Sequence, residues 1–178
     1  MKKYKTGLVL GRFQTFHNGH EYIINKALEI CDKVLVFIGS SDKFGTIENP
    51  FSYELRKKLI KKIYENEIVE NKLVISPLAD LGAGNVTKWG DYLFCEAEKI
   101  LGKVDCIVYG EESKCKSWFS KKIKKSVNFI VISRDDIKIN ASTLRNYMKE
   151  NDFERWRKFV NEKNWGEFEK MREILIKI

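Results

Sequence analysis

Short apolar runs alternate with amphipathic stretches along most of the chain, and this alternation restricts the fold more than any other feature of the sequence. Apolar runs of strand length occur at 5–11, 34–39, 72–78, 105–110 and 127–133. Between the first two runs, apolar residues repeat at helical spacing, at Ile23, Ile24, Ala27, Leu28 and Cys31. Strands and helices in alternation favour an α/β fold with a doubly wound parallel sheet of five strands.

Further helices are expected at 52–63, where Ser52 can cap the first turn, at 89–101, and throughout the chain after residue 140. We therefore predict a Rossmann-like α/β domain over residues 1–150 and a C-terminal helical extension of the same domain over 151–178. Such sheets bind ligands at the carboxyl ends of their strands. The loops of interest are 11–20, 39–51, 79–89, 110–117 and 133–145.

The charge balance has two interpretations. A total of 33 Lys+Arg against 25 Asp+Glu gives +8, which indicates either an anionic partner such as nucleic acid or a lysine-rich solvated surface. The lysines fall in scattered pairs, so we favour the solvated surface and expect no nucleic-acid partner. These pairs are Lys57–Lys58, Lys61–Lys62, Lys121–Lys122 and Lys124–Lys125. No apolar run approaches the ~18 residues of a membrane helix, so we expect a cytoplasmic protein without a membrane partner.

The four cysteines do not form a metal-binding pattern. They are Cys31, Cys95, Cys106 and Cys115. None belongs to a C-x-x-C pair, and none has a histidine at metal-ligand spacing. We expect buried or partly buried free thiols and no metal site built from protein ligands.

The segment 11–20 carries the strongest functional signal. It contains His17 and His20, the only histidines of the chain, which can point at one ligand from the first turn of a helix. Gly19 allows a ligand to approach the backbone, and the helix N-terminus favours an anion. Arg12 adds a permanent positive charge that can clamp phosphate oxygens. The segment therefore predicts a polyphosphate site.

The same segment, G-R-F-Q-T-F-H-N-G-H, resembles the signature of the nucleotidylyltransferase superfamily, whose core is H-x-G-H. The G-R-F-Q prefix resembles nicotinamide mononucleotide (NMN) adenylyltransferases of archaeal type and the matching domain of bifunctional bacterial regulator enzymes. Six further segments resemble family motifs in the same order, so the resemblance extends over about residues 5–162. They are G-S-S at 39–41, T-I-E-N-P-F-S at 46–52 with Glu54 and Arg56, Trp89, Y-G-E-E-S at 109–113, I-N-A-S-T-L-R at 139–145, and the aromatic-apolar set Trp156, Phe159 and Val160. Thr15 and Asn140 depart from the usual residues.

The resemblance implies transfer of the adenylyl group of ATP to NMN or nicotinate mononucleotide, in NAD biosynthesis, with release of pyrophosphate. It implies catalytic roles for His17, His20, Arg12 and Arg145, without a protein nucleophile. The implied ATP-binding residues are Gly11, Arg12, Phe13, His17, Gly19, His20, Asn140, Ser142 and Arg145. Mg²⁺ would accompany ATP, held largely by phosphate oxygens and water.

The implied acceptor-binding residues are Phe13, Ser40, Asn49 and Trp89. Two of them have an alternative interpretation: Trp89 either stacks on the pyridine ring or belongs to the core, and Asn49 either binds substrate or caps the turn at Pro50. Arg56 is interpreted as a structural residue or a solvated helix charge. Trp156 and Trp165 indicate core or subunit contacts, which leaves a homo-oligomer open.

Three other functions are considered. The first is nucleotidyl transfer to another phosphorylated acceptor, and the second is a nicotinamide-nucleotide sensor without catalysis. The third is a basic nucleic-acid-binding protein, which only the +8 charge supports. The sequence does not separate NMN from nicotinate mononucleotide.

Overall fold

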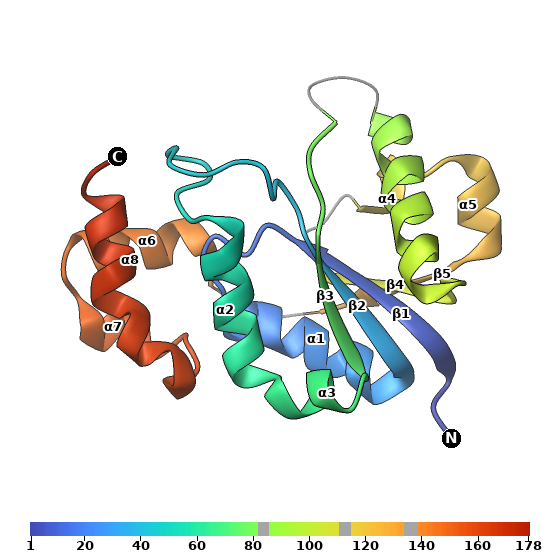
Figure 1. Ribbon diagram of the computed structural model, residues 1–178, viewed down its shortest axis with the longest axis horizontal. Helices are drawn as coiled ribbons and strands as arrows, with labels where there is room; N and C mark the ends of the chain where they lie inside the picture. Colours follow the sequence, from blue (N-terminus) through green and yellow to red (C-terminus); the bar gives the residue numbers. More distant parts are fainter. Residues whose placement is uncertain (82–85, 111–114, 134–138) are drawn as a thin grey trace.

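The computed structural model describes residues 1–81, 86–110, 115–133 and 139–178 (Figure 1). Its centre is a five-stranded sheet in the order β3-β2-β1-β4-β5, in which every pairing is parallel. The strands are β1 (Tyr4–Gly11), β2 (Cys31–Ile38), β3 (Leu73–Pro77), β4 (Cys106–Gly110) and β5 (Asn128–Ile132). The strand order reverses between β1 and β4, as in a doubly wound sheet. The predicted α/β fold class is confirmed.

Helices follow the strands in chain order. They are α1 (Asn18–Ile30), α2 (Tyr53–Ile63), α3 (Glu65–Val69), α4 (Val86–Leu101), α5 (Lys121–Ser126), α6 (Ala141–Lys149), α7 (Phe153–Arg157) and α8 (Phe168–Leu175), with 3₁₀ turns η1 (Cys115–Trp118) and η2 (Glu162–Glu167). Ser52 caps α2 as predicted, its hydroxyl accepting from the Leu55 N–H. Strand β2 begins three residues earlier than predicted, because the exposed Asp32 and the half-buried Lys33 near its start interrupt the apolar pattern.

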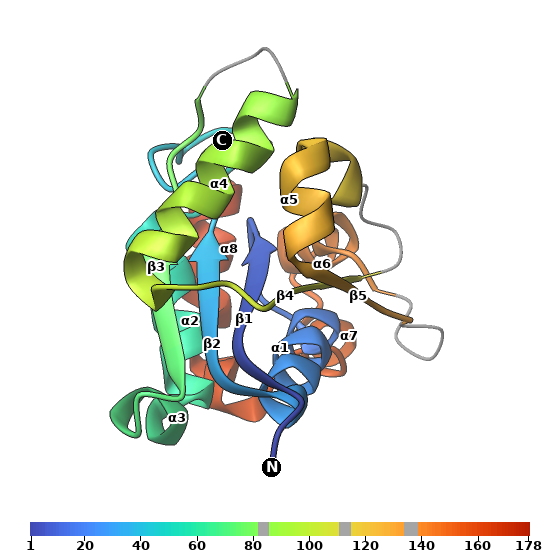
Figure 2. The same ribbon diagram turned by 90° about the vertical axis from the view of Figure 1, so that its right-hand side faces the viewer.

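Helices cover both faces of the sheet (Figures 1 and 2). The alternating side chains of the strands divide the core into two layers, one on each face. On β1, Val9 belongs to the layer beneath α1 and α2, whereas Leu8 belongs to the layer beneath α4 and α5. On β2, Val36 and Leu35 divide in the same way. This period of two, with both faces apolar, is what a sheet covered by helices on both sides requires.

The C-terminal helices pack on the first of these layers. Trp156, Phe168 and Met171 are all nearly inaccessible to solvent and join the same buried cluster as α1 and α2. The side-chain amide of Asn164 donates to the Leu59 carbonyl at 3.0 Å, which ties η2 to α2. The predicted core role of Trp156 is confirmed. The division of the chain at residue 150 stays a prediction.

A buried carboxylate provides a second tie to α2. Glu167 is 5% exposed, and its Oε1 lies 2.7 Å from Lys58 Nζ and 2.5 Å from Lys62 Nζ. The side chains of Lys58 and Lys62 are 49% and 35% exposed, in agreement with the predicted solvated face, but they also pair with this carboxylate. Their ammonium groups lie within reach of an acid more than 100 positions along the chain, which local spacing does not reveal.

The described cysteines differ in burial. Cys31 and Cys106 are buried free thiols whose sulfur atoms lie 3.4 Å apart, as predicted for free thiols, but Cys95 is exposed. The reason is its position on α4, where Leu93, Phe94 and Ala97 face the sheet and Cys95 faces away. The side chain of Cys115 lies outside the described residues.

None of the helices within the described ranges is both long and apolar enough to cross a membrane.

We predict that Glu167→Gln lowers the free energy of unfolding by roughly 1–2 kcal/mol at pH 7, because it removes the charge that Lys58 and Lys62 surround. Burial alone would raise the pKa of Glu167, but the two ammonium groups outweigh it and hold the pKa below its usual value. A carboxyl with a lowered folded-state pKa stabilises the fold above its unfolded pKa, about 4.3, and loses that contribution as the pH falls.

The measurement is urea unfolding at pH 7 and near pH 3. The difference between wild type and Glu167→Gln should shrink at the lower pH. Glu169→Gln is the matched control, because Glu169 is exposed and its ion pair with Arg172 is long, at 3.8 Å. Equal effects of the two substitutions at pH 7 would contradict the prediction.

Candidate functional site

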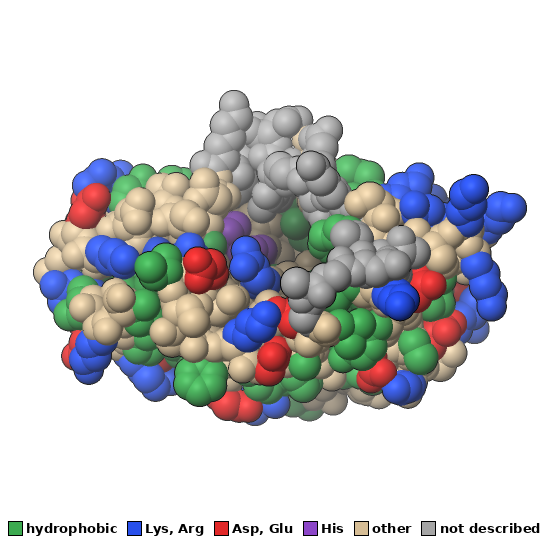
Figure 3. Space-filling view, turned by 90° about the horizontal axis from the view of Figure 1, so that it is seen from above, with side chains coloured by type: hydrophobic (Ala, Val, Ile, Leu, Met, Phe, Trp, Pro, Cys, Tyr) green, Lys and Arg blue, Asp and Glu red, His purple; other side chains and the backbone are tan. Residues whose placement is uncertain are grey.

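The predicted polyphosphate segment lies directly after β1, at the carboxyl end of the sheet. Arg12 is exposed there, whereas residues 13–17 are buried beneath the start of α1. A space-filling view onto this end shows histidine side chains beside a hollow in the surface (Figure 3). This is the edge at which doubly wound sheets bind ligands.

The two histidines lie against one another at the start of α1. The ring centroids of His17 and His20 are 3.8 Å apart with 28° between the planes. His17 is the N-cap of the helix: its Nδ1 accepts from the Gly19 N–H at 3.1 Å. Because Nδ1 is the acceptor, the proton of the neutral ring is on Nε2. His17 therefore both starts the helix and carries a donor on the opposite side of its ring.

Aromatic side chains support the second histidine. The Phe13 ring meets His20 edge-on at 4.9 Å, and the Phe16 ring stacks on it at 5.7 Å. Phe13 reaches this position with a φ of +52°, in the left-handed region. Its ring also lies so close to Gly11 that a Cβ there would be 2.7 Å from it. Gly11 and Phe13 are thus brought to the histidines, at a position where only glycine leaves room.

Gln14 joins the first loop to the 46–52 segment. Its side-chain amide donates to the Phe51 carbonyl at 3.0 Å, and its amide oxygen accepts from the Phe51 N–H at 2.9 Å. Both residues are buried. Hydrogen bonds between residues 37 positions apart therefore join the two motifs into one unit in space.

Arg56 connects α2 to the loops that follow β1 and β2. Its guanidinium, inaccessible to solvent, donates to the carbonyls of Arg12 at 2.8 Å, Gly39 at 2.8 Å and Ser40 at 3.0 Å. The interpretation as a solvated helix charge is wrong, and the structural one is confirmed. Burial lowers the pKa of Arg56 to about 10, with a contribution from the charge of Arg12, so the group is still protonated at neutral pH.

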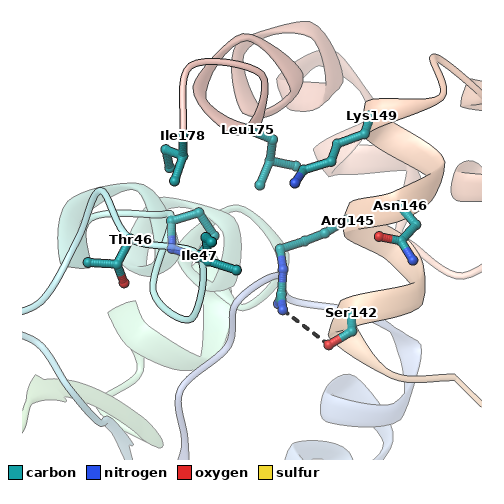
Figure 4. A pocket seen from close by; sticks show the side chains of 9 residues that line it. Thr46, Ile47, Ser142, Arg145, Asn146, Lys149, Leu175 and Ile178 are labelled. Atoms are coloured by element: carbon teal, nitrogen blue, oxygen red, sulfur yellow. Dashed lines mark hydrogen bonds between the residues drawn. The ribbon is translucent and has the colours of Figure 1, made fainter.

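Arg145 approaches the histidine loop from α6. It donates to the Gln14 carbonyl and, at 3.1 Å, to the Ser142 hydroxyl (Figure 4). Burial lowers the pKa of Arg145, and the nearby charge of Arg12 lowers it further. Asn140 caps α6: its Oδ1 accepts a hydrogen bond from the Thr143 N–H at 2.9 Å. The structure thus brings the two predicted arginines near one another at the histidine loop.

The residues predicted to bind the acceptor are divided between two places. Ser40, directly after β2, donates to Asp80 at 3.0 Å, and Asp80 also pairs with Lys43 at 2.8 Å. Burial alone would raise the pKa of Asp80, but Lys43 and Ser40 hold it below its usual value. Asp80 was not predicted as a site residue, although its position directly after the third strand was a usable signal.

Asn49 is 8% exposed and lies beside Gln14's partner Phe51. Its amide oxygen has no hydrogen-bond partner among the described residues, so that atom does not cap the Pro50 turn. Its backbone N–H donates to the Thr46 hydroxyl at 3.0 Å. The orphaned oxygen favours the ligand-binding interpretation, which stays a prediction.

Trp89 lies in the first turn of α4, on the other layer of the core. Its ring meets Trp118 edge-on at 5.2 Å and is partly buried. The next residue must be glycine: a Cβ at Gly90 would come within 2.0 Å of the Trp118 carbonyl oxygen. Partial burial agrees with both interpretations of Trp89. Parts of the predicted loops, at 82–85, 111–114 and 134–138, lie outside the described residues, and so do residues 111–113 of the Y-G-E-E-S motif.

The fold and this site define a doubly wound α/β protein that gathers histidine and arginine side chains at a helix N-terminus. The chain belongs to the cytidylyltransferase-like family, whose model matches residues 8–163. The predicted family resemblance is confirmed.

Named relatives agree with this family. The nicotinamide-nucleotide adenylyltransferase of Thermococcus kodakarensis is 34% identical over 90 residues, which are 50% of this chain and 47% of the relative. That of Thermoplasma volcanium is 28% identical over 128 residues, 72% of this chain and 67% of the relative. With several of these relatives, including the first, the match spans about half of the relative's length.

A crystal structure from Francisella tularensis has a similar fold. It is a bifunctional NMN adenylyltransferase/ADP ribose pyrophosphatase complexed with AMP and a Mn ion. The sequences are 26% identical with a TM-score of 0.74, and the match covers 98% of this chain and 52% of the other.

We predict that Arg56→Lys lowers the free energy of unfolding by about 3 kcal/mol, because one ammonium group cannot serve three carbonyls that diverge from a guanidinium. Chemical denaturation measures the loss. Lys61→Gln is the control, because Lys61 is exposed on the same helix. Surface substitutions usually change the free energy of unfolding by less than about 0.5 kcal/mol. If Arg56→Lys and the control differed by less than that amount, the structural role of Arg56 would be contradicted.

Proposed function

We propose that this chain transfers the adenylyl group of ATP to NMN or nicotinate mononucleotide, forming the dinucleotide and pyrophosphate, as a step of NAD biosynthesis. The observation that carries the proposal is the stacked pair of His17 and His20 at the N-terminus of α1, with Arg145 bound to the adjoining loop. The names of the archaeal relatives support the choice of acceptor.

In the proposed reaction, a 5′-phosphate oxygen of the mononucleotide attacks the α-phosphorus of ATP. The bond from that phosphorus to the bridging oxygen breaks, and pyrophosphate leaves with the electron pair. Catalysis then consists of positioning and charge stabilisation. His17 through its Nε2–H, together with His20, would donate to the oxygens of the α-phosphoryl group.

Cationic and backbone groups would hold the rest of ATP. Arg12 and Arg145 would clamp the phosphates from two sides, since each lies at the histidine loop. The remaining proposed ATP contacts are Gly11, Phe13, Gly19, Asn140 and Ser142. Of these, Ser142 is exposed beside Arg145, whereas Asn140 and Phe13 already have structural roles that a ligand would share.

Mg²⁺ is proposed to accompany ATP. No group of three or more His, Cys, Asp or Glu in the described part of the chain is arranged to hold a metal ion. The proposed ion is held mainly by phosphate oxygens and water, while the protein binds the phosphates. When bound, the ion would neutralise phosphate charge.

The proposed acceptor contacts are Phe13, Ser40, Asn49 and Trp89. Asn49 offers a buried amide oxygen, and the partly buried Trp89 ring offers a face for a pyridine ring. A cytoplasmic location, the absence of a nucleic-acid partner and a homo-oligomer stay predictions.

The experiment measures pyrophosphate release from Mg-ATP with NMN, nicotinate mononucleotide or pantetheine phosphate. We predict release with a pyridine mononucleotide and a loss of roughly 10²–10³-fold in kcat for His20→Ala, the usual cost of removing one transition-state donor. Release with pantetheine phosphate alone would overturn the acceptor. Dinucleotide binding without release would favour a sensor.

His17 allows a sharper comparison. We predict that His17→Asn retains the folded stability of the wild type, because asparagine also caps helices, but loses activity as His17→Ala does. His17→Ala should in addition lose about 1 kcal/mol of stability. Thermal unfolding and the release assay measure the two effects. Full activity in His17→Asn would show that only the cap matters.

A further inference from the structure

The start of α1 is held from outside by the chain that follows α7. The backbone N–H of Asn18, the residue directly after His17, donates to the Phe159 carbonyl at 2.8 Å. The side-chain amide of Asn18 donates to the Lys158 carbonyl at 3.4 Å. The 158–161 segment therefore contacts the first residue of the helix that carries both histidines.

The hydrogen bonds of the first helical turn show why this contact matters. The N–H groups at the start of an α-helix have no acceptor one turn earlier in the helix, so they need other partners. The Gly19 N–H donates to the His17 ring at 3.1 Å, and the His20 N–H donates to the His17 carbonyl at 2.8 Å. The Asn18 N–H instead has its acceptor on Phe159, outside the helix. The direction of the first turn therefore depends on where this carbonyl lies.

Asn161 forms a second contact within the same turn of α1. Its amide nitrogen donates to both carboxylate oxygens of Glu21, at 3.0 and 3.3 Å. Its amide oxygen accepts from the Lys163 N–H at 3.1 Å and so caps η2. The reverse orientation would place the oxygen against a carboxylate and the nitrogen against an N–H, so these two neighbours determine how the amide lies. Glu21 directly follows His20, which brings the contact to the second histidine.

The 158–161 segment has its own attachment to the core. Val160 is 4% exposed, and its carbonyl accepts from the Trp165 indole N–H at 2.9 Å. Trp156, in the helix directly before the segment, is inaccessible to solvent within the same buried cluster. Because these contacts fix the segment independently of α1, it can determine where the helix begins.

An open groove separates the neighbouring face of α1 from η2. Its volume is about 600 Å³, and Asn18, Glu21, Tyr22 and Asn25 form its α1 wall. Their spacing of i, i+3, i+4 and i+7 places them on one face of the helix. Asn161 belongs to the opposite wall. Side chains do not fill this space, so hydrogen bonds rather than close packing hold α1 on this side.

We propose that the 158–161 segment positions His17 and His20 for the proposed reaction. Asn161 is then a positioning residue, which acts through Glu21. The inference rests on the proposed function and gives the C-terminal segment a part in it. A donor to the transition state acts only from the correct position, and a misplacement of about 1 Å can lower a rate about 100-fold. Loss of the Asn161 contact should therefore lower kcat rather than weaken the binding of the mononucleotide.

The test compares a single and a double variant in the pyrophosphate-release assay. Asn161→Asp keeps an oxygen that can cap η2 but places a second carboxylate against Glu21. We expect it to lower kcat about tenfold to 100-fold and to leave the KM for the mononucleotide within about twofold. The double variant Glu21→Gln/Asn161→Asp exchanges donor and acceptor and keeps one negative charge in the pair. It should restore most of kcat.

Asn25→Asp is the matched control. It adds the same charge to the α1 wall of the groove, and its carboxylate can still accept from the Tyr64 hydroxyl, which donates to Asn25 at 2.8 Å. Thermal unfolding shows whether each variant is folded at the assay temperature. If Asn161→Asp does not fold, Asn161→Ser takes its place. Serine also caps helices, adds no charge and is too short to reach Glu21, so the same fall in kcat is expected.

NMR signals of the ring nitrogens of the two histidines separate this inference from the proposed function. Asn161→Asp, but not Asn25→Asp, should shift them, and the double variant should restore them. If the wild type is active but Asn161→Asp and Asn25→Asp have the same kcat, or the double variant is no better than Asn161→Asp, the inference is overturned and the proposed function stands.

If the wild type adenylylates no acceptor, the proposed function fails and the histidine signals decide about the segment. A shift in Asn161→Asp that the double variant reverses supports the positioning of the histidines. Unchanged signals, or a shift that persists in the double variant, overturn the inference as well.

Discussion

The site depends on one buried cation, the guanidinium of Arg56. It donates to backbone carbonyls after β1 and after β2, at Arg12, Gly39 and Ser40, and so fixes two loops to one helix. Carbonyl acceptors leave the positive charge without a carboxylate in contact, and burial accordingly lowers the pKa of Arg56. Such an arrangement is stable only while these hydrogen bonds are made, because a buried charge with an unmet bond is costly.

The position of the histidine pair follows from that constraint. With the carbonyl of Arg12 fixed, the chain turns through Phe13 in the left-handed region and through Gln14, whose side chain forms two hydrogen bonds with Phe51. The helix then begins at His17, whose own ring closes the first turn. Each step uses a backbone group that would otherwise be buried without a partner, so the loop has few alternative conformations.

The separation in sequence between interacting residues decides which features of the fold and the site could be predicted. Strands, most helices and the meeting of His17 with His20 depend on spacing within a few residues, and local patterns report such spacing directly. The roles of Arg56, Asp80 and Glu167 depend on partners 16 to 109 positions away, which no local pattern contains. Family resemblance identified the segment around Arg56, but the direction of its guanidinium became visible only in the folded chain.

Two buried charge arrangements in this chain differ in a way that bears on function. Glu167 is neutralised by Lys58 and Lys62, so its charge stabilises the fold itself. Among the described residues Arg145 forms no ion pair with a carboxylate; burial lowers its pKa and the charge of Arg12 lowers it further, so both disfavour its protonated form. An anionic ligand would favour that form, because it supplies a negative charge. The charge of Glu167 thus stabilises the fold, whereas the charge of Arg145 is the one that the proposed binding of phosphate would use.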